Sequence, residues 1–194
     1  MRDQQVRSAV MSENEARIDA GAVEKPANWL NLPVEVAASI LAVTTVLIAL
    51  GPLHLPPWAV FIGWAGTFAM GGPTRENLKR IWPVMPLGSF AAFLIVLGFQ
   101  QAAQVFTGAA YVIAEMVILF VLNGAMIAVS RVSSVFTFVP GMFFGFASFF
   151  ATFFGSFGPD PKNPFLALLA AIFMNALGPA YAWLNVKLAA PHGK

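Results

Sequence analysis

The chain has 194 residues, of which 58% are hydrophobic and 10% are charged, and its mean hydropathy is +0.74. A core of this size cannot hide so much apolar surface from water, so the composition excludes a soluble globular domain and predicts an integral membrane protein. The net charge of +2, with basic residues in short loops, argues against a nucleic-acid partner, and the lack of cysteine excludes disulfides, thiolate metal sites and a cysteine nucleophile.

Residues 1–30 mix acidic and basic side chains with alanine and valine. This segment is too polar for a secretory signal peptide, so we predict a mixed-charge cytoplasmic tail. Residues 31–190 form the predicted all-α membrane domain, and residues 191–194 form a short C-terminal tail. Because a spanning helix needs about 20 mainly apolar residues, we predict six spans, at residues 36–51, 57–72, 83–104, 110–130, 133–155 and 163–189.

The lysine and arginine residues predict the orientation of these spans, because such residues near span ends are retained on the cytoplasmic side. With six spans and both termini in the cytoplasm, only Lys162 of the 11 lysine and arginine residues lies on the outer side. An odd number of spans would move Lys187 and Lys194 to that side. The sequence therefore predicts a multi-pass protein of the bacterial inner membrane with both termini inside.

The second and fifth predicted spans contain similar segments, at residues 61–69 and 143–151. The identical positions are Phe61/Phe143, Gly63/Gly145, Ala65/Ala147, Phe68/Phe150 and Ala69/Ala151. Each segment is followed by a Gly-Pro turn and then by a span that we expect to begin near a proline, Pro83 or Pro164. Since such a unit holds three spans, the second copy must enter the membrane with opposite polarity, which predicts a 3+3 inverted repeat. Chance similarity between apolar helices rich in phenylalanine, glycine and alanine is the alternative.

Small residues recur at helical spacing in both segments. The stripe in the fifth span consists of Gly141, Gly145, Ser148, Thr152 and Gly155, and its counterpart in the second span consists of Ala59, Gly63, Gly66 and Met70. Small stripes let helix backbones approach closely in lipid, so we expect the fifth span to pack on the second. In a functional interpretation, Ser148 and Thr152 instead face a solute pathway.

Aromatic residues accompany these stripes, and two pairs occupy equivalent positions of the repeat. The pairs are Trp64 with Phe146 and Phe68 with Phe150. Aromatic rings can form a slot that passes a flat neutral solute or gates a pore by excluding water, although they also serve as plain packing.

Three polar residues lie within predicted spans and are further candidates for a substrate pathway. Glu115 is the only carboxylate well inside a span, where it can bind a cation, relay a proton or hold a substrate amine, or can extend instead to the outer headgroups. Asn123 lies near the same helical face as Glu115, and Asn175 lies in the last span. Hydrogen bonding between helices is the simpler explanation for either asparagine.

The sequence contains no phosphate-binding Gly-Lys-Ser/Thr motif, no His-Glu-x-x-His motif and no nucleophile elbow. His54 and His192 both lie outside the predicted spans, which argues against a multi-histidine metal site or a buried haem. We therefore expect no enzyme, no metal and no cofactor.

The segment Phe-Val-Pro-Gly-Met-Phe-Phe-Gly at residues 138–145 resembles a bacterial inner-membrane family catalogued as domain of unknown function 1097. The Phe-x-Gly sequence at residues 61–63 and the Gly-Pro-Ala-Tyr sequence at residues 178–181 add to this resemblance, which covers about residues 35–188. The resemblance implies a small multi-span membrane protein of unassigned activity and contributes no catalytic residue.

These patterns favour a small-solute channel or secondary transporter with a pathway between two three-helix repeats. The alternative is a non-transporting membrane subunit or scaffold whose helices serve packing and partner contacts. The expected partners are the lipid bilayer and a small solute, and the small size of a six-span bundle also admits a homo-oligomer.

Overall fold

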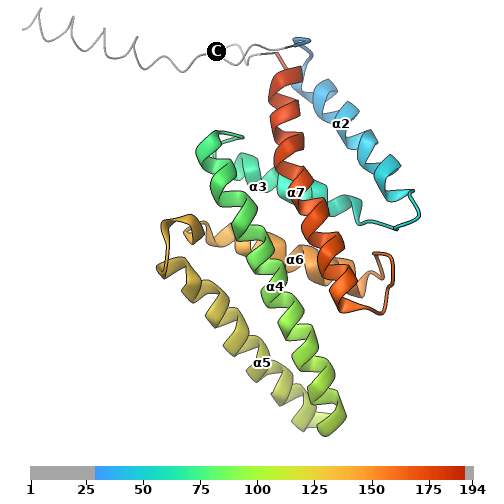
Figure 1. Ribbon diagram of the computed structural model, residues 1–194, viewed down its shortest axis with the longest axis vertical. Coiled ribbons are helices and arrows are strands. Elements are labelled where there is room, and N and C mark those ends of the chain that lie inside the picture. Colours follow the sequence, from blue (N-terminus) through green and yellow to red (C-terminus); the bar gives the residue numbers. More distant parts are fainter. Residues whose placement is uncertain (1–28, 191–194) are drawn as a thin grey trace, which may run out of the picture.

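The fold is that of a computed structural model, which describes residues 29–190, and this part of the chain is helical throughout (Figure 1). It contains six α-helices and two short 3-10 helices. The α-helices are α2 (Val34–Ala49), α3 (Pro57–Ala69), α4 (Arg75–Val105), α5 (Gly108–Ala128), α6 (Val139–Phe154) and α7 (Pro164–Leu188), and the 3-10 helices are η1 (Val129–Arg131) and η2 (Ser134–Phe136). Almost all of the predicted N-terminal tail, together with the C-terminal tail, lies outside the described residues.

Three of the described helices are long and apolar enough to cross a membrane: α4, α7, and α5 extended through η1 to Arg131. Helices α2 and α6 are also apolar but have 16 residues each, and α3 has 13. The lengths and compositions of these helices are therefore compatible with a membrane protein.

Two helices begin several residues away from the starts of the predicted spans. Helix α4 begins at Arg75, eight residues before the predicted start at Pro83, because the Thr74 side chain accepts a hydrogen bond from the Asn77 backbone N–H and caps the helix. Pro83 and Pro86 therefore lie inside a continuous helix, and the prediction that a proline begins this span was wrong. Helix α6 begins at Val139 rather than at residue 133, because Ser134–Phe136 forms the 3-10 helix η2.

The prediction for the last span agrees with α7, which begins at Pro164. The Asn163 side chain accepts hydrogen bonds from the backbone N–H groups of Phe165 and Leu166. Proline is tolerated at the first helical position because a backbone N–H there would have no acceptor within the helix. The second span ends earlier than predicted, at Ala69, because Gly71 and Gly72 have φ values of 96° and 99° that terminate the helix.

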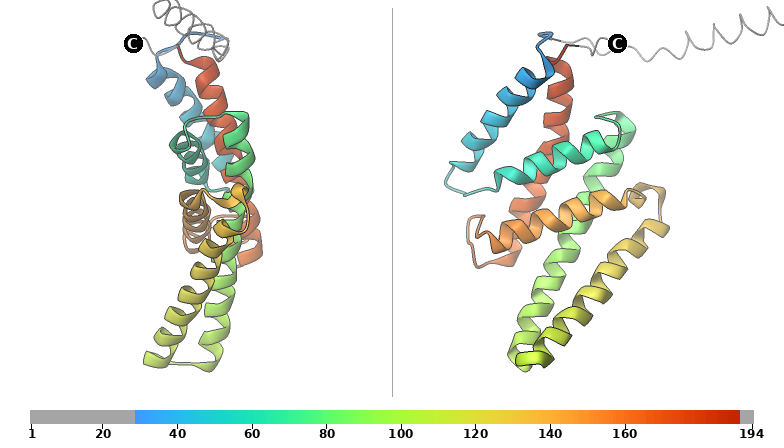
Figure 2. Two further views of the ribbon diagram at one scale, coloured as in Figure 1. Left: turned by 90° about the vertical axis from the view of Figure 1, so that its left-hand side faces the viewer. Right: turned by 180° about the vertical axis from the view of Figure 1, so that it is seen from behind.

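The six helices form a flat, elongated molecule (Figure 2). Helices α4 and α7 run antiparallel along its length, and the shorter α3 and α6 cross them obliquely while running in opposite directions to each other (Figure 1). The most extensive contacts are those of α6 with α4 and of α3 with α7. Helix α2 packs against α7 at one end of the molecule, and α5 packs along α4 at the other end.

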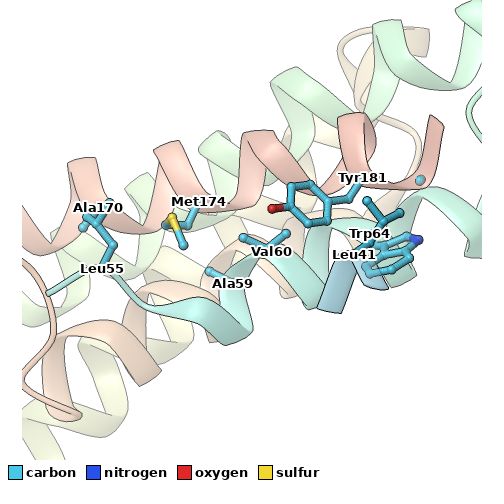
Figure 3. Packing of buried hydrophobic residues seen from close by; sticks show 9 residues of the cluster. Leu41, Leu55, Ala59, Val60, Trp64, Ala170, Met174 and Tyr181 are labelled. Atoms are coloured by element: carbon cyan, nitrogen blue, oxygen red, sulfur yellow. The ribbon is translucent and has the colours of Figure 1, made fainter. Parts of the chain in front are cut away.

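Three clusters of buried apolar side chains hold this arrangement together. The first lies between α2, α3 and α7 and includes Leu41, Val60, Trp64, Met174 and Tyr181 (Figure 3). The second joins α4, α6 and α7 around the fully buried Phe149, and the third joins α4, α5 and α6 around Met126 and Met142. The core therefore lies along the crossings of the short helices with the long helices.

Candidate functional site

Two glycine crossings bring the short helices into backbone contact with the long helices. At Gly63 of α3, an added Cβ would overlap the backbone carbonyl oxygen of Asn175, and at Gly178 of α7 it would overlap the backbone of Gly63 and Trp64. The two backbones can approach this closely only because Gly63 and Gly178 carry no side chain.

The second crossing repeats the first with different residues. An added Cβ at Gly145 of α6 would overlap the carbonyl oxygen of Met85, and one at Gly88 of α4 would overlap that of Met142. In both crossings, the glycine of the short helix meets a carbonyl that lies three residues before the glycine of the long helix. The two crossings share this feature, although Gly88 meets the carbonyl of Met142, whereas Gly178 meets the backbone of Gly63 and Trp64.

A buried polar pair lies beside the first crossing. The Ser148 hydroxyl on α6 donates to Asn175 Oδ1 on α7 at 2.9 Å, and both side chains are almost completely buried. Within the described residues, Asn175 Nδ2 is buried and has no hydrogen-bond partner. Rotating the amide by 180° would make Nδ2 the partner of Ser148 and would leave Oδ1 free, so in either orientation one polar atom lacks a partner.

Three more buried hydroxyls surround these crossings and bind backbone carbonyls. Thr67 donates to the Gly63 carbonyl at 2.8 Å, and Thr152 donates to the Ser148 carbonyl at 2.7 Å, each within its own helix. Ser89 of α4 donates to the Gly145 carbonyl of α6 at 2.9 Å. The sequence analysis included Thr152 but missed Thr67 and Ser89. The available signal for Ser89 was a hydroxyl residue directly after a glycine, Gly88, within an apolar run.

Prolines interrupt the hydrogen-bonding pattern of both long helices at the same region. Pro179 has no N–H for the Asn175 carbonyl, which is the carbonyl that Gly63 contacts, and Pro86 has none for the Trp82 carbonyl. Trp82 in turn donates its indole N–H to the Ala176 carbonyl at 3.1 Å and links α4 to α7. Backbone carbonyls without their usual helical donor therefore lie where the four central helices, α3, α4, α6 and α7, meet.

The predicted pathway residues divide between this region and the outside of the molecule. Ser148, Thr152 and Asn175 are buried together at the crossings, whereas Glu115 and Asn123 are half-buried on α5, which packs along α4. Figure 1 shows α5 away from α3 and α7. The structure therefore does not bring Glu115 and Asn123 to the Ser148–Asn175 pair.

The aromatic candidates also divide. Trp64 is buried in the first core cluster, with its ring centroid 5.8 Å from that of Tyr181, and Phe68 is 42% exposed. Phe146 and Phe150 are half-buried on α6, with ring centroids 4.8 Å apart. These rings pack on different sides of the crossings and do not enclose one slot.

The glycine stripes make close contacts, but mostly not with the helix that we expected. Gly63 contacts α7 and Gly145 contacts α4, so these glycines do not make the predicted contact between the fifth and second spans, although α6 does contact α3. Gly66 lies next to the Phe144 ring of α6, and Gly141 lies next to Val84 of α4. Gly155 is an exposed residue at the end of α6, where an added Cβ would meet its own helix and the Phe157 ring.

A second polar cluster, which the sequence analysis did not identify, lies between α2 and α7. Thr44 donates to the Leu41 carbonyl at 2.6 Å, so the hydroxyl of Tyr181, 2.8 Å away, is the donor in the bond between Tyr181 and Thr44. One helical turn after Tyr181, Asn185 is buried, and within the described residues its Oδ1 has no partner. The adjacent threonines at positions 44 and 45 were the available signal in the sequence.

None of the side chains named in these polar clusters is charged. Arg80 and Glu76 form an exposed ion pair of 2.7 Å near the start of α4. Within residues 29–190, no group of three or more histidine, cysteine, aspartate or glutamate side chains could hold a metal ion. The candidate site is therefore neutral and is built from hydroxyl, amide and backbone groups.

Comparison with known proteins identifies a family but no relative with an assigned activity. No curated protein and no solved structure shows significant similarity to the chain. The model of one protein family, described as "Protein of unknown function (DUF1097)", matches residues 35–190, from the beginning of α2 to just beyond the end of α7. The chain therefore belongs to the DUF1097 family.

Proposed function

We propose that this protein is a channel or secondary transporter for small solutes, with no enzymatic activity, and that its pathway lies between two three-helix repeats in the bacterial inner membrane. The observation that carries the proposal is the buried Ser148–Asn175 pair with one amide atom free, at the meeting of four central helices. Polar groups at membrane depth are expensive and commonly mark a substrate route.

The two glycine crossings support an inverted repeat. Gly145 follows Gly63 by 82 residues, as in the sequence repeat, and Gly178 follows Gly88 by 90. One repeat then comprises α2, α3 and α4, and the other comprises α5, α6 and α7. In Figure 1 the equivalent helices of each pair run in opposite directions, as expected for copies related by a two-fold axis in the membrane plane.

The positions of the loops support six spans with alternating direction. The loops at residues 70–74 and 129–138 lie on the left in Figure 1, and those at 50–56 and 155–163 lie on the right. Arg75 and Arg131 adjoin the left-hand loops, and Lys162 lies in a right-hand loop. This distribution favours a cytoplasmic left side and cytoplasmic termini.

The short helices support a pathway near the middle of the bilayer. At about 1.5 Å per residue, α3 is roughly 20 Å long and α6 roughly 24 Å long, less than the hydrocarbon thickness of about 30 Å. Short or interrupted helices at equivalent positions of two repeats are typical of transporter binding sites. The prolines of α4 and α7 add backbone carbonyls that lack their usual donor.

The test is solute uptake into liposomes that contain the purified protein, using urea, acetamide, glycerol and lactate as probes. We expect uptake of at least one probe, and we expect Asn175→Leu to reduce it about tenfold, equivalent to ~1.4 kcal/mol, because the amide is replaced by an apolar group of similar size. Glu115→Gln and Asn123→Leu on α5 are the controls and should leave uptake unchanged. Absence of uptake with folded wild-type protein would refute the proposal.

A second candidate function, a non-transporting membrane subunit or scaffold, is favoured by the exposure of α5. Only Met126 of its residues is buried, and an open apolar groove of about 640 Å³ lies between α4 and α5. A membrane-embedded partner, or a second copy of this chain, would cover these surfaces. A partner that co-purifies in stoichiometric amounts, together with no uptake of any probe, would favour this function.

A further inference from the structure

A small cavity is lined in part by Asn175, the residue of the candidate site whose amide has an unpartnered atom. Its volume is about 10 Å³, and it is lined by Ile81, Trp82, Met85 and Pro86 of α4 and by Asn175 and Ala176 of α7. A volume of ~10–15 Å³ by this measure is what one water molecule needs, provided that polar partners are present.

One lining residue of α7, Asn175, carries a buried donor without a partner. Asn175 is 1% exposed, its Oδ1 is occupied by Ser148, and its Nδ2 has no protein partner within the described residues. A buried donor without a partner is costly, so a bound molecule that accepts a hydrogen bond from Nδ2 would stabilise the site.

A lining residue of α4, Trp82, has a backbone carbonyl that lacks its usual helical donor. Trp82 and Pro86 both line the cavity, and Pro86 removes the N–H that would otherwise bind the Trp82 carbonyl. The indole of Trp82 reaches across to the Ala176 carbonyl and joins the two helices at the cavity. A ligand here can accept from α7 and donate to α4.

We propose that this cavity binds one uncharged hydroxyl group, either that of a water molecule or that of a small solute. The group accepts a hydrogen bond from Asn175 Nδ2 and donates one to the carbonyl oxygen of Trp82. None of the lining side chains is charged, so an ion would lose its hydration without compensation. The binding of water does not depend on the proposed function, whereas the selection of neutral solutes over ions rests on it.

The experiment is nuclear magnetic resonance of the purified full chain with ¹⁵N-labelled asparagine, with Asn175→Leu used to assign the Asn175 side-chain amide. We expect cross-relaxation between the Asn175 amide protons and a bound water. In the solute arm, glycerol should shift the Asn175 signal, and potassium chloride at the same concentration should not. Cross-relaxation without a glycerol shift would support bound water and would overturn the solute as a ligand.

Pro86→Ala tests the acceptor without removing the amide. It restores a backbone N–H that can donate to the Trp82 carbonyl, so we expect loss of the water cross-relaxation in a helix that remains intact. Pro83→Ala is the matched control, because Pro83 lies in the same helix and does not line the cavity. Cross-relaxation that is absent in the wild type, or that survives Pro86→Ala unchanged, would overturn the proposal.

The same samples separate this inference from the proposed function. Bound water at Asn175 with no uptake of any probe would refute transport and leave the binding site intact. Uptake of potassium or chloride at rates equal to those of glycerol would overturn the selection of neutral groups while supporting a pathway.

Discussion

At the scale of single residues, Asn175 of α7 meets three other helices. Its backbone carbonyl lies against Gly63 of α3, its Oδ1 accepts from Ser148 of α6, and the residue lines a cavity together with residues of α4. Asparagine suits this position because its amide combines a donor and an acceptor without a charge. Hydrogen bonds between helices in lipid are modest in strength, so the arrangement of these groups matters more than the strength of one bond.

We expect Ser148 and Asn175 to be energetically coupled. In a double-mutant cycle of Ser148→Ala and Asn175→Leu, the coupling free energy of unfolding should be about 0.6–1.7 kcal/mol, the range for hydrogen bonds between membrane helices. The free energy of unfolding of each variant is measured by titration with a denaturing detergent. Asn123→Leu combined with Ser148→Ala is the control cycle and should be additive within ~0.5 kcal/mol. Equal coupling in both cycles would contradict the bond.

At the scale of helices, the glycine crossings determine how the short helices sit on the long helices. Gly145 and Gly63 face carbonyl oxygens of α4 and α7, with no room for a Cβ. Lipid provides no hydrophobic force between helices, so close backbone packing must supply the attraction. The hydroxyl of Ser89, which binds the Gly145 carbonyl, strengthens the crossing of α4 and α6.

Gly145→Leu should therefore destabilise the protein severely, by more than ~3 kcal/mol, because the side chain would separate α6 from α4. Gly124→Leu on α5 is the matched control, since no atom outside its own helix backbone lies within 4 Å of an added Cβ at Gly124. Both changes replace glycine with a better helix former, so helix propensity cannot explain a difference between them. Yield of monodisperse protein and its melting temperature measure the effect, and normal values for Gly145→Leu would contradict the contact.

At the scale of the whole molecule, the proposed mechanism depends on the opposite orientation of the two halves. Two short helices cross two antiparallel long helices (Figure 2), and in the proposed inverted repeat these two crossings are equivalent. Movement of one half against the other would then expose the Ser148–Asn175 region alternately to the two sides of the membrane.

The orientation can be tested with single cysteines, because the natural chain has none. In intact cells, we expect a membrane-impermeant thiol reagent to label Asp160→Cys and not Arg75→Cys. Both positions are exposed, and the beginning of α4 and the loop between α6 and α7 lie on opposite sides of Figure 1. Permeabilised cells, in which both cysteines should react, are the control. Labelling of both positions in intact cells would show that the two loops share one face and would refute the inverted arrangement.

The sequence by itself determined the helical class and the approximate position of each helix. Apolar runs, a polar cap such as Asn163, and turn glycines such as Gly71 and Gly72 act within a few residues, so local patterns predict them well. The start of α4 was mispredicted because proline was treated as a helix terminus. A membrane helix continues through Pro83 and Pro86, since neighbouring helices can satisfy the released carbonyls.

Only the tertiary structure decided which helices touch and which candidates share a site. Small residues and aromatic rings allow many helix pairs, so the sequence could not show that Gly145 meets Met85 or that Ser148 meets Asn175. Nor could it show that Glu115 and Asn123 lie on a peripheral helix, because helical periodicity assigns a residue to a face and leaves the neighbour of that face open. Helix partners depend on the fit of backbones far apart in the chain, and that fit is a property of the assembled fold.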